Sequence, residues 1–198
     1  MQNTTMVVGL GNAFVNSTQT MADYEMAEQK AIEMSYPNIG ILFRAAATME
    51  EVHMQKLKAL YADFTKSQSA INKFDTLQNI RKYDRGMSMA FLLDSTKHVI
   101  PYFMGIQSYQ VNDLYASLAA QAETANNPEL AKMYLWFMDS ESGAYKLFMD
   151  AYTNFAYSQD FVTQYNVCLR CGSIYPSDDQ IQYCTVCQES ATNFIAVK

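Results

Sequence analysis

Apolar residues along the first 157 positions recur at intervals of three and four, a spacing typical of amphipathic helices. This pattern predicts four long helices, at about 11–35, 37–63, 101–123 and 128–157. The sequence Asn127-Pro128-Glu129 is a typical helix start, because the amide caps the first turn and proline suits the first helical position. Pro37 and Pro101 are expected to begin the second and third helices in a similar way.

The connection between the second and third predicted helices is long and covers residues 64–100, with some helix expected at 71–83. Four long helices with one long crossover in the middle describe a ferritin-like four-helix bundle. We therefore expect a mainly α fold, with the bundle at 1–157, a linker at 158–163 and a small four-cysteine module at 164–198.

Each predicted helix carries polar residues on its otherwise apolar face, at about the same level of the bundle. The second helix has Glu50 and His53 there, and the fourth has Glu141. A buried carboxylate is costly unless it binds a metal, pairs with a cation or takes a proton. Glu50-x-x-His53 has the i, i+3 spacing of di-iron carboxylate bundles, which puts both side chains on one face. The other polar positions at this level are Ser17, Gln107 and Gln110.

The four cysteines lie close together near the C-terminus, as Cys168, Cys171, Cys184 and Cys187. Two Cys-x-x-Cys pairs can form the two halves of a tetrahedral thiolate site for iron or zinc. Two disulfides or a redox-active dithiol are the alternatives, and the paired spacing in a reducing compartment disfavours both. A segment this short cannot bury a sufficient core of its own, so it needs an additional constraint, such as a bound metal, to fold. Gly172 suits a tight turn after the second cysteine, whereas Gln188 predicts a less regular turn after the fourth.

Charge and hydropathy exclude several classes of partner. The formal net charge of -6 and the sequence pI of about 4.8 argue against nucleic acid and anionic membranes, which attract basic patches. No apolar run approaches the ~20 residues that span a bilayer, and the first residues lack the basic flank and apolar stretch of a signal peptide. We therefore expect a cytoplasmic protein that binds neither nucleic acid nor membrane.

Over nearly its whole length the chain resembles the rubrerythrin family. The cysteine spacing, followed by Phe194, is similar to the family's rubredoxin-like tail, and the bundle segments that carry the resemblance are 13–19, 39–53, 107–115 and 133–144. The resemblance implies a non-haem iron oxidoreductase that reduces peroxide at a di-iron centre, with electrons passed through the rubredoxin-type iron under oxidative stress. It also implies dimers in which the tail of one subunit lies near the bundle of the other, and an electron donor protein.

The resemblance assigns seven ligand positions to the di-iron centre, and this chain departs from the family at four of them. The replaced positions are Ser17, Gln107, Gln110 and Ala144. Glu50, His53 and Glu141 remain and are the candidate catalytic residues. Two divalent ions bring four positive charges, of which two carboxylates balance half, so we expect a disabled di-iron site.

The sequence leaves the occupancy of the bundle interior open. One metal ion can be held by Glu50, His53 and Glu141, with Gln107, Gln110 or water completing its coordination. Alternatively no metal binds and a protonated His53 pairs with the carboxylates, or a di-iron centre forms despite the changes. A further alternative is a site adapted to another metal or small ligand.

We expect an electron-transfer protein with iron, or zinc, at an intact rubredoxin-type site, whose bundle forms a homodimer or pairs with a related bundle. The alternative is a peroxide reductase with a modified centre at Glu50, His53 and Glu141. Tyr24 and Tyr109 fall near the polar level and are interpreted as ordinary core aromatics, with hydrogen bonding to the polar residues as the alternative. His98 is interpreted as a surface or capping residue.

Overall fold

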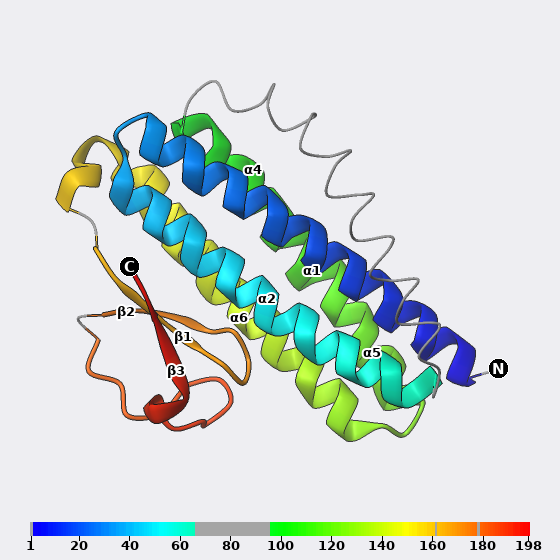
Figure 1. The fold of residues 1–198 in the computed structure, drawn as a ribbon. Coiled ribbons are helices and arrows are strands. Elements are labelled where there is room, and N and C mark those ends of the chain that lie inside the picture. The colour runs from blue at the N-terminus through cyan, green and yellow to red at the C-terminus, as the bar shows by residue number, and fades with distance from the viewer. Residues whose placement is uncertain (1, 66–95, 161, 178) are drawn as a thin grey trace.

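A bundle of long helices and a small C-terminal sheet make up the structure (Figure 1). The computed structural model describes residues 2–65, 96–160, 162–177 and 179–198. The helices are α1 (Gln2–Glu33), α2 (Pro37–Thr65), α4 (Thr96–Tyr109), the π-helix η1 (Gln110–Tyr115), α5 (Ala116–Thr124) and α6 (Pro128–Thr153). The expected mainly α, ferritin-like bundle with a four-cysteine module is confirmed. None of the helices in these ranges is long and apolar enough to cross a bilayer.

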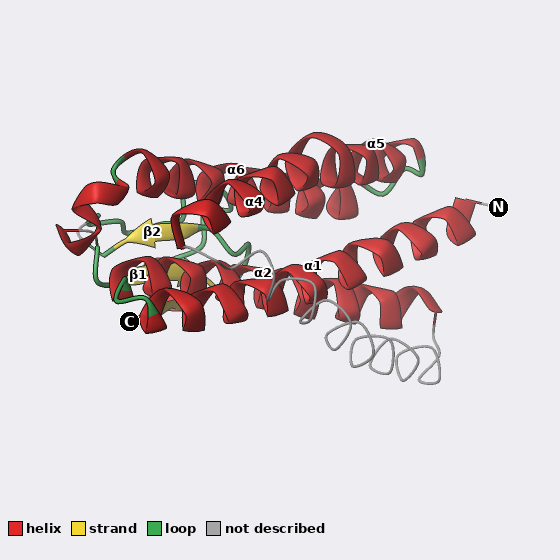
Figure 2. Ribbon diagram, turned by 90° about the horizontal axis from the view of Figure 1, so that it is seen from above, coloured by secondary structure: helices red, strands yellow, loops and turns green. Residues whose placement is uncertain are grey.

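The helices form two antiparallel pairs (Figure 2). In one pair α1 packs along α2, and in the other α6 packs along the continuous run of α4, η1 and α5. The expected helical stretch at 71–83 lies outside the described residues.

Two of the three expected helix starts are confirmed. The Asn127 side chain accepts a hydrogen bond from the Leu130 amide at 3.2 Å, with proline at the first helical position of α6, and α2 begins at Pro37. The expectation for Pro101 is wrong, because this residue lies inside α4. Proline has no amide hydrogen to donate to the Lys97 carbonyl. Because Pro101 is exposed, water can hydrogen-bond to that carbonyl instead.

The third predicted helix contains a π-helical segment that the sequence pattern did not indicate. A π turn adds a residue to each turn, so positions five apart share a face. Gln110 and Tyr115 are five apart and both are fully buried. The segment therefore turns the two glutamines, Gln107 and Gln110, and then Tyr115 toward the bundle interior.

Two apolar clusters fill the bundle, one on each side of the polar level. The first is built on stacked rings, with the Tyr24 and Phe103 centroids 4.3 Å apart and Phe43 and Phe148 beside them. The second contains residues nearer the opposite end, among them Leu10, Leu57, Tyr134 and Phe137. The polar side chains therefore lie between two dry regions.

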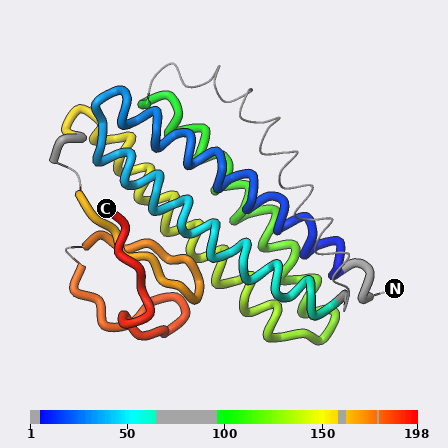
Figure 3. Tube along the Cα trace, in the orientation of Figure 1, coloured from blue at the N-terminus to red at the C-terminus, as the bar shows by residue number. Residues whose placement is uncertain are grey.

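The C-terminal module is a three-stranded antiparallel sheet in the order β2-β1-β3. Its strands are β1 (Tyr165–Cys168), β2 (Ile174–Pro176) and β3 (Phe194–Val197), and short 3₁₀ segments lie at Phe155–Asp160 and Ala191–Asn193. Tyr165 pairs with Pro176 on one side and with Val197 on the other. The chain folds back after α6, so that the module lies against α2 and α6 (Figure 3). Arg44 of α2 donates to the Lys198 carbonyl and ties down the end of β3.

Candidate metal centres

The cysteines converge in the module as two loops that face each other. The Sγ atoms of Cys168 and Cys187 are 3.6 Å apart and those of Cys171 and Cys184 are 3.4 Å apart, and all four are buried and free. A disulfide needs about 2.05 Å, so neither pair is bonded. A tetrahedron of thiolates with metal–sulfur bonds of about 2.3 Å has edges of about 3.8 Å. The four sulfurs therefore fit one tetrahedral metal ion.

The two turns that carry the cysteines have the same backbone geometry. Gly172 has φ 87° and donates its amide to the Cys168 carbonyl at 2.8 Å. Gln188 has φ 61° and donates to the Cys184 carbonyl at 3.0 Å. The expected irregularity of the second turn is wrong, because Gln188 adopts the left-handed conformation that glycine provides in the first.

Hydroxyl groups lie against two of the sulfurs. Ser173 Oγ is 3.2 Å from Cys171 Sγ, and Tyr175 Oη is 3.3 Å from Cys184 Sγ. The Thr185 amide donates to the Tyr175 oxygen at 2.9 Å, and the Thr185 hydroxyl lies 3.0 Å from the same oxygen. When that hydroxyl also donates, the phenol proton is directed to the sulfur. Hydrogen bonds of this kind stabilise negative charge on a thiolate.

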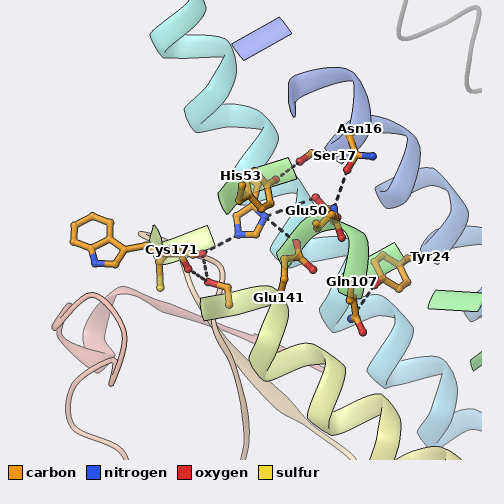
Figure 4. A network of polar contacts seen from close by, with 12 residues as sticks. Asn16, Ser17, Tyr24, Glu50, His53, Gln107, Glu141 and Cys171 are labelled. Atoms are coloured by element: carbon orange, nitrogen blue, oxygen red, sulfur yellow. Dashed lines mark hydrogen bonds and ion pairs between the residues drawn. The ribbon is translucent and has the colours of Figure 1, made fainter. Parts of the chain in front are cut away.

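A second cluster lies in the bundle, where Glu50 and His53 of α2 meet Glu141 of α6 (Figure 4). All three side chains are fully buried, and one ligand atom of each lies within 4.8 Å of the others. His53 Nδ1 is 3.3 Å from Glu141 Oε1 and 3.7 Å from Glu50 Oε2. The structure thus brings together the three residues that the sequence analysis retained as candidates.

Burial and mutual charge alter the titration of this cluster. Burial lowers the pKa of His53, but the two nearby carboxylates, Glu141 and Glu50, outweigh it and raise the pKa to about 9. Burial and the charge of Glu50 raise the pKa of Glu141 to about 8, although His53 acts in the opposite direction. Without a metal, the cluster therefore retains protons at neutral pH that exposed carboxylates would have lost.

The four positions at which the resemblance predicts lost ligands are all buried, and the polar ones hydrogen-bond to neighbouring side chains. Ser17 Oγ is 3.0 Å from the Tyr115 hydroxyl, and Gln107 Nε2 donates to the Tyr24 hydroxyl at 3.0 Å. Ala144 is buried but offers no ligand atom.

Of these four residues, Gln110 is the one that hydrogen-bonds to the cluster itself. Its amide nitrogen donates to Glu50 Oε1 at 2.6 Å and to Asn16 Oδ1 at 3.0 Å. The amide thus occupies one oxygen of Glu50 and leaves the other facing His53.

Two tyrosines were wrongly or incompletely interpreted from the sequence. Tyr24 is in the core but also hydrogen-bonds to Gln107 at the polar level. Tyr109 is 49% exposed and is neither a core residue nor a neighbour of the cluster, because it precedes the π segment and points outward. His98 is exposed, in agreement with its interpretation as a surface residue.

The two centres are joined through one backbone carbonyl. The carbonyl oxygen of Cys171 is 2.9 Å from His53 Nε2 and 2.7 Å from the Ser140 hydroxyl, which is shared with the Trp136 carbonyl oxygen, also at 2.7 Å. Trp136, also on α6, packs against the cysteine cluster under the Arg170 guanidinium, which lies 4.9 Å from the ring centroid. Sequence reasoning missed Ser140 and Trp136, because no spacing signal relates them to the cysteines. The module thus docks on the bundle of its own chain, through a residue of each centre.

Replacement of Ser140 by alanine tests this junction. Ser140→Ala removes one of the two donors to the Cys171 carbonyl, and we expect the free energy of unfolding to fall by about 1 kcal/mol in urea denaturation. Ser142→Ala on the same helix is the control, with an expected change within about 0.5 kcal/mol. Equal effects of the two substitutions would contradict a role for Ser140 in docking.

Comparisons with known proteins show similarity in sequence and in fold. No family model matches the chain. Rubrerythrin-2 of Clostridium acetobutylicum is 23% identical over 191 residues, which cover 94% of each chain. Structures of nigerythrin in mixed-valence, partially reduced and fully reduced, all-ferrous states match with a TM-score of 0.76 and 20% identity, over 96% of this chain and 86% of theirs. The chain is therefore similar over nearly its whole length to a rubrerythrin, it shares the fold of nigerythrin, and it carries a four-cysteine cluster near its C-terminus.

Proposed function

We propose that this protein is a non-haem iron electron carrier whose bundle does not assemble a pair of irons. One observation supports the proposal above the others: a complete, buried four-thiolate cluster is joined by the Cys171 carbonyl to a bundle cluster with two carboxylates. An electron donor protein and a second copy of the chain, or of a related bundle, are the partners that we expect.

The four thiolates suit iron, which supplies reversible one-electron transfer when bound there. The chain's own residues shape its surroundings. Ser173 and Tyr175 place hydroxyls at two sulfurs, and Trp136 covers the cluster on the bundle side. His53 and Ser140 hold the Cys171 carbonyl and thereby fix the first cysteine loop on the bundle.

Charge argues against two irons in the bundle. Two divalent ions would leave two positive charges unbalanced by Glu50 and Glu141, in an interior where charge is costly. The amides and hydroxyls at Ser17, Gln107 and Gln110 offer no compensating charge. Each of them already makes a hydrogen bond, Ser17 with Tyr115, Gln107 with Tyr24 and Gln110 with Glu50.

The proposal is tested with protein produced in iron-rich medium. We expect a visible thiolate-to-iron spectrum that bleaches on reduction and returns on reoxidation, without appreciable peroxide turnover in the presence of a reduced donor. Zinc alone at the four-cysteine site would contradict electron transfer. Steady-state peroxide reduction at a rate close to that of an intact rubrerythrin would contradict the disabled bundle.

Peroxide reduction at a modified centre is the second candidate function. The observation that favours it is the proximity of ligand atoms from Glu50, His53 and Glu141, all within 4.8 Å of one another. Under this alternative His53→Gln abolishes peroxide turnover while the thiolate spectrum persists. Under the electron-carrier proposal there is no such turnover to abolish.

Tyr175→Phe is expected to lower the reduction potential of the thiolate-bound iron. The reduced site carries one more negative charge than the oxidised site, so a hydroxyl that donates to sulfur favours reduction. A differential contribution of about 1 kcal/mol corresponds to about 40 mV for a one-electron couple.

The reduction potentials of the wild type, Tyr175→Phe and a control variant are measured by spectroelectrochemical titration. Tyr183→Phe, at an exposed tyrosine of the same module, is the matched control and is expected to leave the potential unchanged. A potential for Tyr175→Phe that equals the wild-type value, or exceeds it, would contradict the inferred direction of the hydrogen bond.

A further inference from the structure

We infer that the bundle interior binds a single divalent first-row metal ion through Glu50, His53 and Glu141, in place of a pair of irons. This inference rests on the proposed function, because it assumes that no di-iron centre forms. It assigns an occupant to a cluster that would otherwise be a buried, partly unpaired group of charges.

Unpartnered polar atoms are the first line of support. Four buried atoms of the cluster have no hydrogen-bond partner: Glu50 Oε2, His53 Nδ1, Glu141 Oε1 and Glu141 Oε2. These atoms belong to the same three side chains whose ligand atoms lie within 4.8 Å of one another. Buried polar groups are nearly always satisfied, and an unsatisfied charged group is especially unfavourable. One cation among these atoms would satisfy all three residues.

The orientation of the His53 ring is the second line of support. Its Nε2 lies 2.9 Å from the Cys171 carbonyl oxygen, which can only accept, so Nε2 carries a hydrogen. In the neutral ring the lone pair is then on Nδ1, which faces the two carboxylates. A metal ligand held by a carbonyl at its other nitrogen is the arrangement that fixes the tautomer of a coordinating histidine.

Distances favour a metal ion over a proton at this position. A charge-assisted N–H···O bond spans about 2.7–2.9 Å. The Nδ1 atom is 3.3 Å from Glu141 and 3.7 Å from Glu50, and neither contact forms a hydrogen bond. Ligand atoms around an ion with bonds of about 2.0–2.2 Å are about 3.0–3.5 Å apart. The cluster is therefore spaced more like a coordination sphere than like an imidazolium between carboxylates.

Charge balance sets the number of ions at one. Two carboxylates and a neutral imidazole neutralise one divalent cation, and this net-neutral site suits the dry interior between the two apolar clusters. The carbonyl oxygens of Gln107 and Gln110 are also buried and unpartnered, and amide oxygens add ligands without charge. Imidazole with carboxylate and amide oxygens suits Fe(II), Mn(II), Co(II) or Zn(II).

Co(II) is the probe for the experiment, because its weak d–d bands in an oxygen and nitrogen site differ from the intense charge-transfer bands of a thiolate site. The full chain, with iron in its four-cysteine site, is titrated with Co(II) and analysed for both metals after gel filtration. We expect one cobalt per chain, with the iron spectrum unchanged.

Substitutions then assign the site. Glu141→Gln preserves shape but removes a charged ligand, and we expect the Co(II) dissociation constant to rise by more than the about 10–100-fold typical of residues outside the coordination sphere. Asp139→Asn, at an exposed position on the same helix, is the control and should bind Co(II) as the wild type does. The helical circular-dichroism signal shows that the bundle of each variant is folded, and the retained iron spectrum shows the same for the module.

The outcomes separate this inference from the proposed function. No bound cobalt, or binding that Glu141→Gln leaves unchanged, overturns the single-ion site and leaves the electron-carrier proposal intact. Two cobalt ions per chain that are both lost in Glu141→Gln overturn the inference and the disabled di-iron centre together.

Discussion

Replacing Cys184 with serine is expected to abolish metal binding in the module and to unfold its cysteine loops. The reason is the small interior of the module, in which four cysteines are surrounded by Trp136, Tyr175, Val186 and Phe194. Structural thiolate sites contribute about 10–16 kcal/mol of apparent binding free energy, as much as the about 5–15 kcal/mol that stabilises a whole domain. A serine hydroxyl is protonated at neutral pH and is a poor substitute.

Hydrogen exchange of the intact chain measures this effect segment by segment. In Cys184→Ser we expect residues 168–177 and 179–190 to exchange rapidly while α1, α2 and α6 remain protected, because most residues of the two apolar clusters belong to the bundle helices. Ser177→Ala, exposed on the same module, serves as the control and should retain full protection. If the loops of metal-free Cys184→Ser were as protected as those of the wild type, the module would fold without a metal ion, which would contradict this expectation.

Gly172→Ala is expected to have the second largest effect, on the contact between the module and the bundle. A Cβ atom at this position would lie 2.7 Å from His53 Nε2 and 2.9 Å from Met49 Cγ. The φ of 87° adds the strain of a left-handed residue, about 1–2 kcal/mol, to an overpacking cost of about 1–3 kcal/mol. The combined loss of stability is about 2–5 kcal/mol.

Urea unfolding of Gly172→Ala should therefore show a much lower midpoint than the wild type. Gly143→Ala is the matched control, since nothing lies within 4 Å of the added Cβ and alanine is favoured over glycine inside a helix. That control should gain about 0.5–1 kcal/mol. A stable Gly172→Ala protein with the His53–Cys171 contact intact would contradict the close docking described here.

The sequence predicted those features that depend on residues close together in the chain, namely the cysteine loops, the helix cap and the long helices. The Cys-x-x-Cys pairs converge as expected, because each loop places its own two sulfurs and only one partner loop exists among the described residues. The Asn127 cap and the helical pattern of α1, α2 and α6 likewise depend on neighbours in sequence. Glu50, His53 and Glu141 were found because charge interrupts an apolar stripe.

Tertiary packing determines the features that the sequence did not indicate. Pro101 lies within a helix because the surrounding residues Val99, Ile100 and Phe103 are buried in the bundle and hold the segment helical. The π segment at Gln110–Tyr115 is set by the burial of both of its end residues, which a regular helical period cannot produce.

The junction between the two centres is equally invisible in the sequence. His53 and Cys171 are 118 positions apart, and their contact involves a backbone carbonyl that every residue possesses. Gly172 was singled out for its turn conformation, and the close approach of the bundle adds a second reason for a glycine there. Only the folded chain relates these residues.

Mössbauer spectroscopy of protein grown on ⁵⁷Fe most directly tests the central claim, that the four-cysteine site holds iron and the bundle holds no iron pair. The account predicts the signal of a tetrahedral four-thiolate iron, with any bundle iron present as an isolated ion. An antiferromagnetically coupled diferric component, in a ratio of two irons to each thiolate-bound iron, would contradict it.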